Sequence, residues 1–520
     1  MTGRYDRVLL RGGVAAAVVL YLLLTGLLAR ARSPFSDEAV LFSPALNLIT
    51  QGHMGTTVLD ESSTWRDGMS LKGINRYTYQ VMPMHFLFQA AWYKVLGAGL
   101  FQMRALSILW GLAALGAWFV IAWSLSQNMA LSVVTLCLLA VDNTFLVSSG
   151  FGRADMTSAS LGFMALAAYL LLRKRKLTVA VIVSHSLAAA SVFTHPVGAL
   201  HLFNLLFLTV YFDRRRISFR HFAAAAAPYT VFTAGWGVYI AQNPAVFWEQ
   251  FRSNAGGRFF MHAPWRMIGD ELGMRYLPEF GFGRDASPVS RLKLYLLLAF
   301  GTALAVALTA RPLRRHPGFR ALLAMNGIAF VAMTFLEGTK QAFYLAHLIP
   351  LHSAVLAVCL WWVWTERKVP RWAIVVLASL LLSLQFARTA HVLKMDTYRT
   401  QYLPAVRFLE KDVQSGKVIV GDAILAFGLG FSKTVIEDLR LGYYTHKTAD
   451  TIVVNDRYKE WFVRLRRREP DVYAYVSTLL STRYERVYDT EAFTIYRLRG
   501  SNEETGAGGF SPIAPSREPK

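Results

Sequence analysis

The chain has 520 residues, of which 54% are hydrophobic and only 17% are charged, and its formal net charge is +22. These values exclude a soluble enzyme of this size, because the apolar residues come in blocks long enough to cross a bilayer. Nucleic-acid binding is not expected either, because the basic residues form short runs between the apolar blocks, as membrane topology and phosphate headgroups favour. The two cysteines, Cys137 and Cys359, both lie inside apolar blocks, so neither a disulfide framework nor a cysteine metal site is expected.

The apolar blocks predict about eleven membrane-spanning helices. They cover residues 9–29, 105–124, 129–148, 157–172, 178–194, 197–212, 222–241, 292–310, 320–336, 342–364 and 372–389. The first block follows several arginines but is not followed by a good cleavage site. We therefore expect it to remain as a membrane anchor rather than to be removed as a signal peptide.

One further segment, 81–97, is apolar enough to be considered as a span, and the basic residues decide against it. Four basic runs lie at 173–176, 214–216, 311–315 and 367–371. With a cytoplasmic N-terminus and without this span, all four fall on the cytoplasmic side, in agreement with the positive-inside rule. Counting the segment as a span would place all four outside. We therefore expect 81–97 to lie along the outer interface or to re-enter from it.

This topology places three large regions outside the cytoplasmic membrane. They are the first loop (30–104), a second loop (242–291) and the tail that follows residue 390. The sequence thus predicts a membrane domain, 1–390, and a soluble extracytoplasmic domain, 391–499. The last residues, 500–520, are rich in Gly, Pro, Ser and charge, which favours disorder.

The tail has the pattern of a small α/β domain. Residues 417–422 and 450–455 are predicted strands, 457–468 and 471–481 are predicted helices, and 487–498 is a predicted closing hairpin.

Ionisable and aromatic side chains gather at the outer ends of the predicted spans. Asp37 and Glu38 end the first span, and carboxylates at that depth are unfavourable enough to mark a functional site. The other candidates are Arg153 and Asp155 between the third and fourth spans, Lys340, Tyr344 and His347 at the start of the tenth, and Lys72 and Arg76 in the first loop. The spacing of Lys340, Tyr344 and His347 predicts that they share one helical face.

Carboxylates and cations on one side of a membrane suit transfer from a lipid phosphate. A carboxylate can take a proton from an acceptor hydroxyl while cations stabilise the departing phosphate. The lipid tail lies in the bilayer, so the reacting atoms would meet at its surface.

Three motifs, in this order and placement, resemble the GT-C superfamily of membrane glycosyltransferases. They are Ser36-Asp37-Glu38 after the first span, Arg153-x-Asp155 after the third, and the segment from Lys340 to Pro350 at the start of the tenth. The branch that the chain resembles is the family 39-like group, which includes protein O-mannosyltransferases and the bacterial lipid A aminoarabinose transferase. The resemblance covers about residues 5–390. It implies an inverting glycosyltransferase with a polyprenyl-phosphate sugar donor and interfacial helices in the first loop.

The resemblance also implies roles for single residues. Asp37 matches the catalytic base, and Asp155 matches a second acidic position that places Asp37, the acceptor or a metal. Arg153 and Lys340 are candidates for the donor phosphate. The remaining substrate-binding candidates are Glu38, Tyr344, His347, Arg76 and Lys72.

One departure from the family pattern concerns the first loop. Some relatives carry a basic residue before the proline of the interfacial helix, whereas here Met82 precedes Pro83. His262 in the second loop could reach the site, as a histidine does in the aminoarabinose branch. We assign no metal ligand, and the use of a divalent metal stays open.

The sequence therefore predicts transfer of a sugar from a polyprenyl-phosphate donor to a hydroxyl of a glycan, lipid or protein, at the outer face of the cytoplasmic membrane. The expected partners are this donor, its acceptor and membrane lipids, without nucleic acid. The main alternative is a transporter or flippase of lipid-linked sugars. Transporters usually show internal repeats and polar groups near the membrane midplane, whereas this chain shows no repeat and carries its candidates at the ends of spans.

Overall fold

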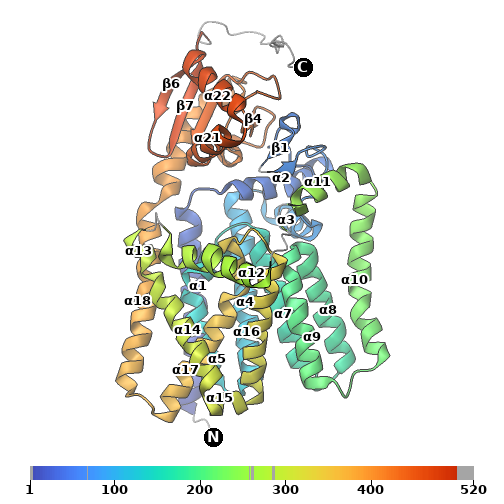
Figure 1. Cartoon of the computed structure of the whole chain (residues 1–520), viewed down its shortest axis with the longest axis vertical. Helices are drawn as coiled ribbons and strands as arrows, with labels where there is room; N and C mark the ends of the chain where they lie inside the picture. Colours follow the sequence, from blue (N-terminus) through green and yellow to red (C-terminus); the bar gives the residue numbers. More distant parts are fainter. Residues whose placement is uncertain (1–3, 67, 257, 259–262, 284–286, 501–520) are drawn as a thin grey trace.

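The computed structural model of the chain describes residues 4–66, 68–256, 258, 263–283 and 287–500. The segment predicted to be disordered, 500–520, lies outside the described residues except for Gly500. The molecule is elongated, with a bundle of long helices below, a layer of short helices above them, and a domain that carries a sheet at the top (Figure 1).

Among the described residues, nine helical segments are long and apolar enough to cross a membrane. Their helices are α1 (Arg4–Ala31), α4 (Leu100–Ser126), α7 (Ala154–Leu172), α8 (Leu177–Thr194), α9 (Ala199–Asp213), α14 (Lys293–Thr309), α16 (Pro317–Leu336), α17 (Ile349–Glu366) and α18 (Arg371–Met395). A tenth span is formed if α5 (Met129–Val141) and α6 (Asn143–Ser149), which meet at an angle of 66°, are counted as one broken helix. The polytopic membrane architecture is confirmed.

The remaining predicted span, 222–241, corresponds to α10 (Phe219–Ile240). This helix has 22 residues and packs alongside α8 (Figure 1). It is not among the candidate spans, which are selected by length and mean hydropathy. The structure thus supports nine or ten spans rather than eleven among the residues it describes.

The segment 81–97 forms α3 (Pro83–Leu96), which has 14 residues. A helix of that length rises only about 21 Å and is too short to cross a bilayer core. It packs against α2 (Ser36–Gln51) at the end of the bundle that carries the sheet domain (Figure 1). The first loop therefore carries two short helices, as the sequence predicted.

Both large loops carry regular structure. The first loop continues through η1 (Glu61–Ser63) and the short hairpin of β1 (Trp65–Arg66) and β2 (Met69–Ser70). The second loop contains α11 (Pro244–Gly256), α12 (Pro264–Asp270), the π-helical turns η3 (Glu271–Tyr276) and η4 (Pro278–Phe282), and α13 (Pro288–Arg291). Helices α12 and α13 lie across the ends of the spanning helices (Figure 1). The short helix α15 (Arg311–Arg315) joins α14 to α16.

The segment before α17 differs from its prediction. Residues 342–347 form a 3₁₀ helix, η5 (Ala342–His347), and α17 begins at Ile349. Pro350 fixes that start, because proline is tolerated in the first turn of a helix and not in its interior. Lys340 precedes η5 with a φ of 55°. The prediction that Lys340, Tyr344 and His347 share one helical face is therefore wrong.

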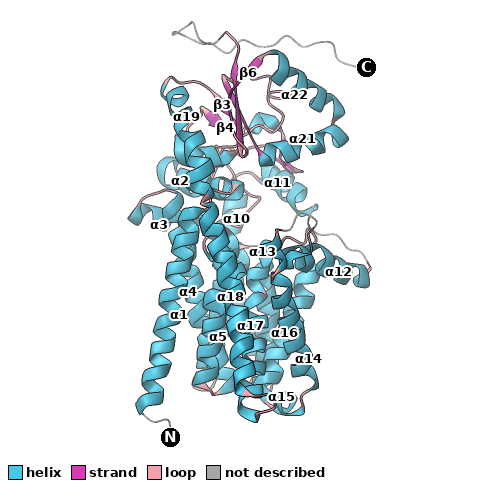
Figure 2. Cartoon of the chain, turned by 90° about the vertical axis from the view of Figure 1, so that its left-hand side faces the viewer, coloured by secondary structure: helices cyan, strands magenta, loops and turns pink. Residues whose placement is uncertain are grey.

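The tail forms a small α/β domain, in agreement with the sequence. A π-helical turn, η6 (Tyr398–Tyr402), leads from α18 into the domain. Its elements are α19 (Leu403–Gln414), β3 (Ile419–Val420), η7 (Ala423–Leu425), α20 (Ala426–Leu429), β4 (Val435–Ile436), β5 (Thr451–Asn455), α21 (Asp456–Arg468), α22 (Pro470–Thr482), β6 (Tyr484–Asp489) and β7 (Phe493–Leu498). The strands form one sheet in the order β4-β3-β5-β7-β6, parallel between β4, β3 and β5 and antiparallel beyond. This sheet lies at the end of the molecule away from the N-terminus (Figure 2).

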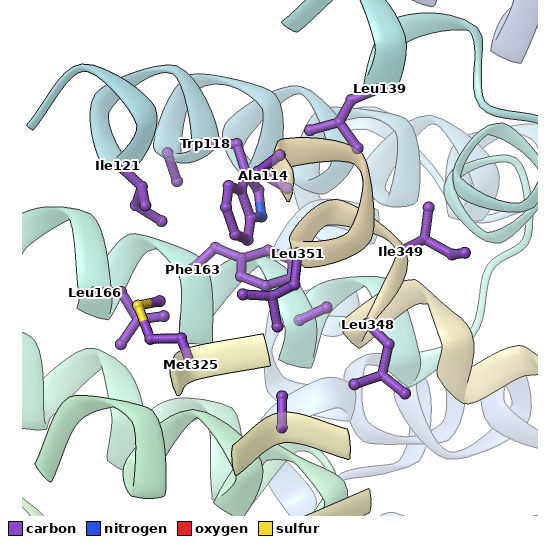
Figure 3. Packing of buried hydrophobic residues seen from close by; sticks show 14 of the residues in the cluster. Ala114, Trp118, Ile121, Leu139, Phe163, Leu166, Met325, Leu348, Ile349 and Leu351 are labelled. Carbon is purple, nitrogen blue, oxygen red and sulfur yellow. The ribbon is translucent and has the colours of Figure 1, made fainter. Parts of the chain in front are cut away.

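Two of the four hydrophobic clusters among the described residues matter most for placing the site. The larger one lies between the spanning helices and includes Trp118, Phe163 and Met325 (Figure 3). A second core is shared between the first loop and the tail domain, where Val40 of α2 belongs to the same cluster as Ile495 of β7. The tail domain is therefore packed directly onto the first loop, where the Asp37 motif begins.

Candidate functional site

The first turn of α2 carries Ser36, Asp37 and Glu38. Carboxylates are favoured in the first helical turn, where the backbone N–H groups are unpaired and the helix dipole is positive. The two acids face different surroundings. The Asp37 side chain is 40% exposed, whereas Glu38 is fully buried.

Both oxygens of Glu38 are occupied by protein donors. Oε1 accepts from Nε of Arg104 at 2.8 Å and from the backbone N–H of Gly152 at 2.9 Å. Oε2 accepts from Nη2 of Arg104 at 2.6 Å and from the N–H of Phe35 at 2.9 Å. A carboxylate offers about four acceptor positions, so this set leaves none for a substrate. The geometry favours a role in holding α2 over the predicted substrate contact.

Arg104 was not identified from the sequence. It also donates to the carbonyl oxygens of Ala29, Arg32 and Ser33, at 2.6, 2.8 and 3.0 Å, and so satisfies the end of α1. The fork of a guanidinium suits such multiple bonding. A charge at the end of an apolar span is a signal that could have found it.

Asp37, Arg153 and Asp155 meet in one ion-pair chain. Nη1 of Arg153 donates to Asp37, and its Nε donates to Asp155 at 2.7 Å. The Arg153 and Asp155 side chains are 9% and 5% exposed, so Asp37 is the member that opens to solvent. Burial alone would lower the pKa of Arg153, but the carboxylates of Asp155 and Asp37 outweigh it and raise that pKa. Arg153 therefore stays charged beside the two carboxylates.

Two further features belong to this ion-pair chain: an aromatic ring beside Arg153 and a carboxylate oxygen of Asp155 without a hydrogen-bond partner. The Arg153 guanidinium lies 4.2 Å from the ring centre of Phe343, within cation–π distance. Oδ1 of Asp155 is buried and has no hydrogen-bond partner among the described residues. Asp155 is thus able to accept one further hydrogen bond on the side away from Arg153.

Beside this chain lies Tyr344, which is buried in η5. Its hydroxyl accepts from Nη1 of Arg258 at 3.0 Å and lies 3.5 Å from Nε2 of His195. Burial raises the pKa of Tyr344 to about 12, so the phenol stays protonated at neutral pH. His347 is also buried and shares a hydrogen bond of 2.9 Å with His201. The prediction that Tyr344 belongs to the site is consistent with this placement. His347 hydrogen-bonds to His201 through Nδ1 and also lies close enough to Asp155 for their charges to interact.

Arg258 is a second residue that was not identified from the sequence. It is half-buried and lies in the second loop just after α11, where no local motif marks it. Arg258 borders a cavity of about 90 Å³ together with His195 and Asn254. The other walls are residues 79–82, which lead into α3, residues 196–197, Phe251, Ala255, Leu336 and Glu337. The cavity therefore places an arginine next to the short helix of the first loop.

Three predicted cations are not brought into this chain by any described contact. Lys340 is buried, donates to the carbonyl of Thr334 at 2.6 Å and pairs with Glu271 at 3.0 Å. Lys72 is 60% exposed and pairs with Glu249 at 3.0 Å. Arg76 is exposed and lies 5.9 Å from the ring centre of Tyr77. Lys340 belongs to a buried network with Arg275 and Glu337 rather than to the open face.

No group of three or more His, Cys, Asp or Glu side chains within the described parts of the chain could hold a metal ion. His262, considered from the sequence, lies outside the described residues. The residues described around Asp37 thus do not fit a metal site, and no metal is assigned to them.

Comparison with known proteins gives a structural answer only. No family model matches the chain, and no curated protein matches it by sequence. A structure of ArnT from Cupriavidus metallidurans bound to undecaprenyl phosphate is similar, with a TM-score of 0.60, 14% identity, and coverage of 94% of this chain and 98% of that one. The Archaeoglobus fulgidus oligosaccharyltransferase, in complex with Zn and sulfate, is similar with a TM-score of 0.55, 12% identity, and coverage of 94% and 73%.

A further structure of the Archaeoglobus fulgidus protein, AglB, contains an inhibitory peptide and a dolichol-phosphate. It matches with a TM-score of 0.51, 12% identity, and coverage of 96% and 75%. Identities this low show the fold alone. The chain is a multi-pass membrane protein with the GT-C fold.

Proposed function

We propose that the protein is a glycosyltransferase that moves a sugar from a polyprenyl-phosphate donor to a hydroxyl acceptor. The observation that carries this proposal is the position of Asp37. Asp37 is the partly exposed member of three carboxylates, the others being Glu38 and Asp155. Two buried arginines, Arg104 and Arg153, form ion pairs with these carboxylates. The fold adds support, because similar structures are described with undecaprenyl phosphate and with dolichol-phosphate.

In the proposed reaction, Asp37 is the general base. Its carboxylate takes the proton of the acceptor hydroxyl, and the acceptor oxygen attacks the anomeric carbon from the side opposite the phosphate. The bond from the anomeric carbon to the phosphate oxygen breaks, and its electron pair leaves with the polyprenyl phosphate. A single displacement of this kind inverts the anomeric centre. Asp155 pairs with Arg153, the arginine that also contacts Asp37, and keeps it in place. The Oδ1 atom of Asp155 can accept a hydrogen bond from the acceptor.

The leaving phosphate needs a cation near the membrane surface. Arg258 fits this need better than Lys340, because it is half-buried and borders a cavity, whereas Lys340 is paired inside the protein. Tyr344 orients the Arg258 guanidinium through a 3.0 Å hydrogen bond. Arg153 is a second candidate cation, paired with Asp37 and Asp155, whereas Lys72 and Arg76 of the first loop make no described contact with these residues.

The membrane placement is inferred from the same site. Helix α2, whose first turn carries the motif, and the tail domain lie at one end of the bundle (Figure 1), and the positive-inside rule makes this the outer face. The N-terminus is then cytoplasmic and the tail domain extracytoplasmic. The acceptor would be a lipid, polysaccharide or protein hydroxyl delivered from that side.

A donor panel tests the proposed class. The purified protein is incubated with radiolabelled polyprenyl-phosphate sugars, and donor consumption is followed with and without a chelator of divalent metals. We expect one donor to be consumed, with release of the polyprenyl phosphate. Movement of intact lipid-linked sugar across vesicles, without cleavage of the sugar–phosphate bond, would identify a flippase instead.

A further inference from the structure

Asp37 lies between two neighbours that are each held by a buried arginine. Glu38 is tied to Arg104 and so to the spanning helices. Ser36, on the other side, is tied to the tail domain. Its hydroxyl accepts from Nη2 of Arg66 at 2.8 Å and donates to Oε2 of Glu437 at 3.4 Å. The first turn of α2 is therefore fixed from two directions.

Glu437 is the centre of this second anchor. Its Oε1 accepts from Nε of Arg66 at 2.6 Å, and its Oε2 accepts from Nη1 of Arg457 at 2.8 Å. A further bond of 3.2 Å comes from the backbone N–H of Ala423. The Glu437 and Arg66 side chains are only 1% and 6% exposed. Burial alone would raise the pKa of Glu437, but Arg457 and Arg66 outweigh it and lower that pKa to about 2.

The backbone joins the same two units at the same point. The N–H of Glu437 donates to the carbonyl of Val58 at 2.9 Å, and Leu59 forms a parallel bridge with Glu437. The first loop thus adds to the edge of the tail sheet beside β4. This pairing fixes the backbone of Glu437 at the point from which its side chain reaches Ser36.

Other contacts join the first loop to the tail domain without touching α2. Lys447 pairs with Asp60 at 2.7 Å, and Nη1 of Arg440 donates to the carbonyl of Trp65 at 2.9 Å. These contacts serve docking alone. Variants of these contacts can therefore test the docking of the domain separately from the hydrogen bond between Glu437 and Ser36.

We propose that Glu437 and Arg66 are positioning residues, which hold Ser36 so that the Asp37 carboxylate faces the acceptor hydroxyl. This inference rests on the proposed role of Asp37 as general base. The tail domain thereby becomes part of the catalytic machinery. Displacement of a reacting group by about 1 Å can lower a rate on the order of 10²-fold, so an anchor beside a general base has a large effect on turnover.

The kinetic test compares Glu437→Gln with Lys447→Gln, a matched variant that removes an ion pair between the same two units. We expect Glu437→Gln to lower kcat on the order of 10²-fold at unchanged donor KM, and Lys447→Gln to retain wild-type kcat. Ser36→Ala removes only the hydroxyl link and should lower kcat in the same direction without loss of thermal stability. Equal kcat values in Glu437→Gln and Lys447→Gln, or wild-type kcat in Ser36→Ala, would overturn the proposal.

A second readout needs no sugar. Hydrogen–deuterium exchange of a peptide covering residues 33–42 reports the opening of the first turn of α2, where the N–H of Glu38 donates to the carbonyl of Phe35. We expect faster exchange in Glu437→Gln and in Ser36→Ala than in Lys447→Gln. Unchanged exchange in all three refutes the anchor. Faster exchange together with full activity of Asp37→Asn would instead refute the proposed role of Asp37 and leave the anchor standing.

Discussion

The buried pair of Glu38 and Arg104 allows a prediction that separates two roles for the acidic motif. Replacing Glu38 with Gln removes the charge that balances Arg104 and weakens two of its shortest side-chain contacts. Breaking a buried pair by removing one partner costs about 3–5 kcal/mol, because the other charge is left uncompensated. The same change in the exposed pair of Lys72 and Glu249 should cost about 0–1 kcal/mol.

The assay is a double-mutant cycle on the detergent-solubilised protein, with unfolding followed by denaturant titration. Glu38→Gln and Arg104→Gln should each lower the free energy of unfolding by about 3–5 kcal/mol. The double variant should lose less than the sum of the two, by about 0.5–3 kcal/mol. Glu249→Gln serves as the control. If Glu38→Gln keeps wild-type stability and instead raises the donor KM, Glu38 contacts substrate as the sequence suggested, and the anchoring role assigned to it is refuted.

Three further outcomes are expected. Arg258→Ala should raise the donor KM about tenfold or more, since a hydrogen bond to a charged group contributes about 1.5–3 kcal/mol, and an unchanged donor affinity in equilibrium binding would exclude it from the phosphate site. Lys72→Ala and Arg76→Ala should each change turnover less than about twofold, since surface charges away from the reacting groups contribute little, and a loss of activity in either would restore them as donor ligands. The free energy of unfolding should fall as the pH is lowered from 6.5 towards 4. Burial lowers the pKa of His347 from 6.5 to about 4, so that only the unfolded chain takes up the proton in this range. His347→Asn should flatten this pH dependence, as measured by thermal unfolding across the same range.

The sequence could predict the features that depend on local pattern. Apolar block length identified the spanning helices, apart from the additional span expected at α10, and the basic runs placed α3 outside the span count, because these properties belong to contiguous residues. The motifs around Asp37 and Arg153 were placed in one region because both follow spans that end on the same side. Their ion pair, across 116 positions of sequence, agrees with this placement.

What could not be predicted is which charges are paired inside the protein. Arg104 is 66 positions from Glu38, and Arg66 is 371 positions from Glu437, so spacing carries no information about either pair. Lys340 and Arg258 also show that a motif does not reveal which charges are paired inside the protein. A lysine in a recognisable motif is buried against Glu271, whereas an arginine in a loop without a motif borders the cavity.

The general-base role of Asp37 is tested most directly by Asp37→Asn, with donor binding and sugar transfer measured on the same preparation. The variant keeps the size of the side chain and an acceptor oxygen for Arg153, so the fold and the donor affinity should be retained. Transfer should fall about 10²–10⁴-fold, as expected for the loss of a positioned general base. Transfer at close to the wild-type rate, with the donor bound normally, would contradict the account at its centre.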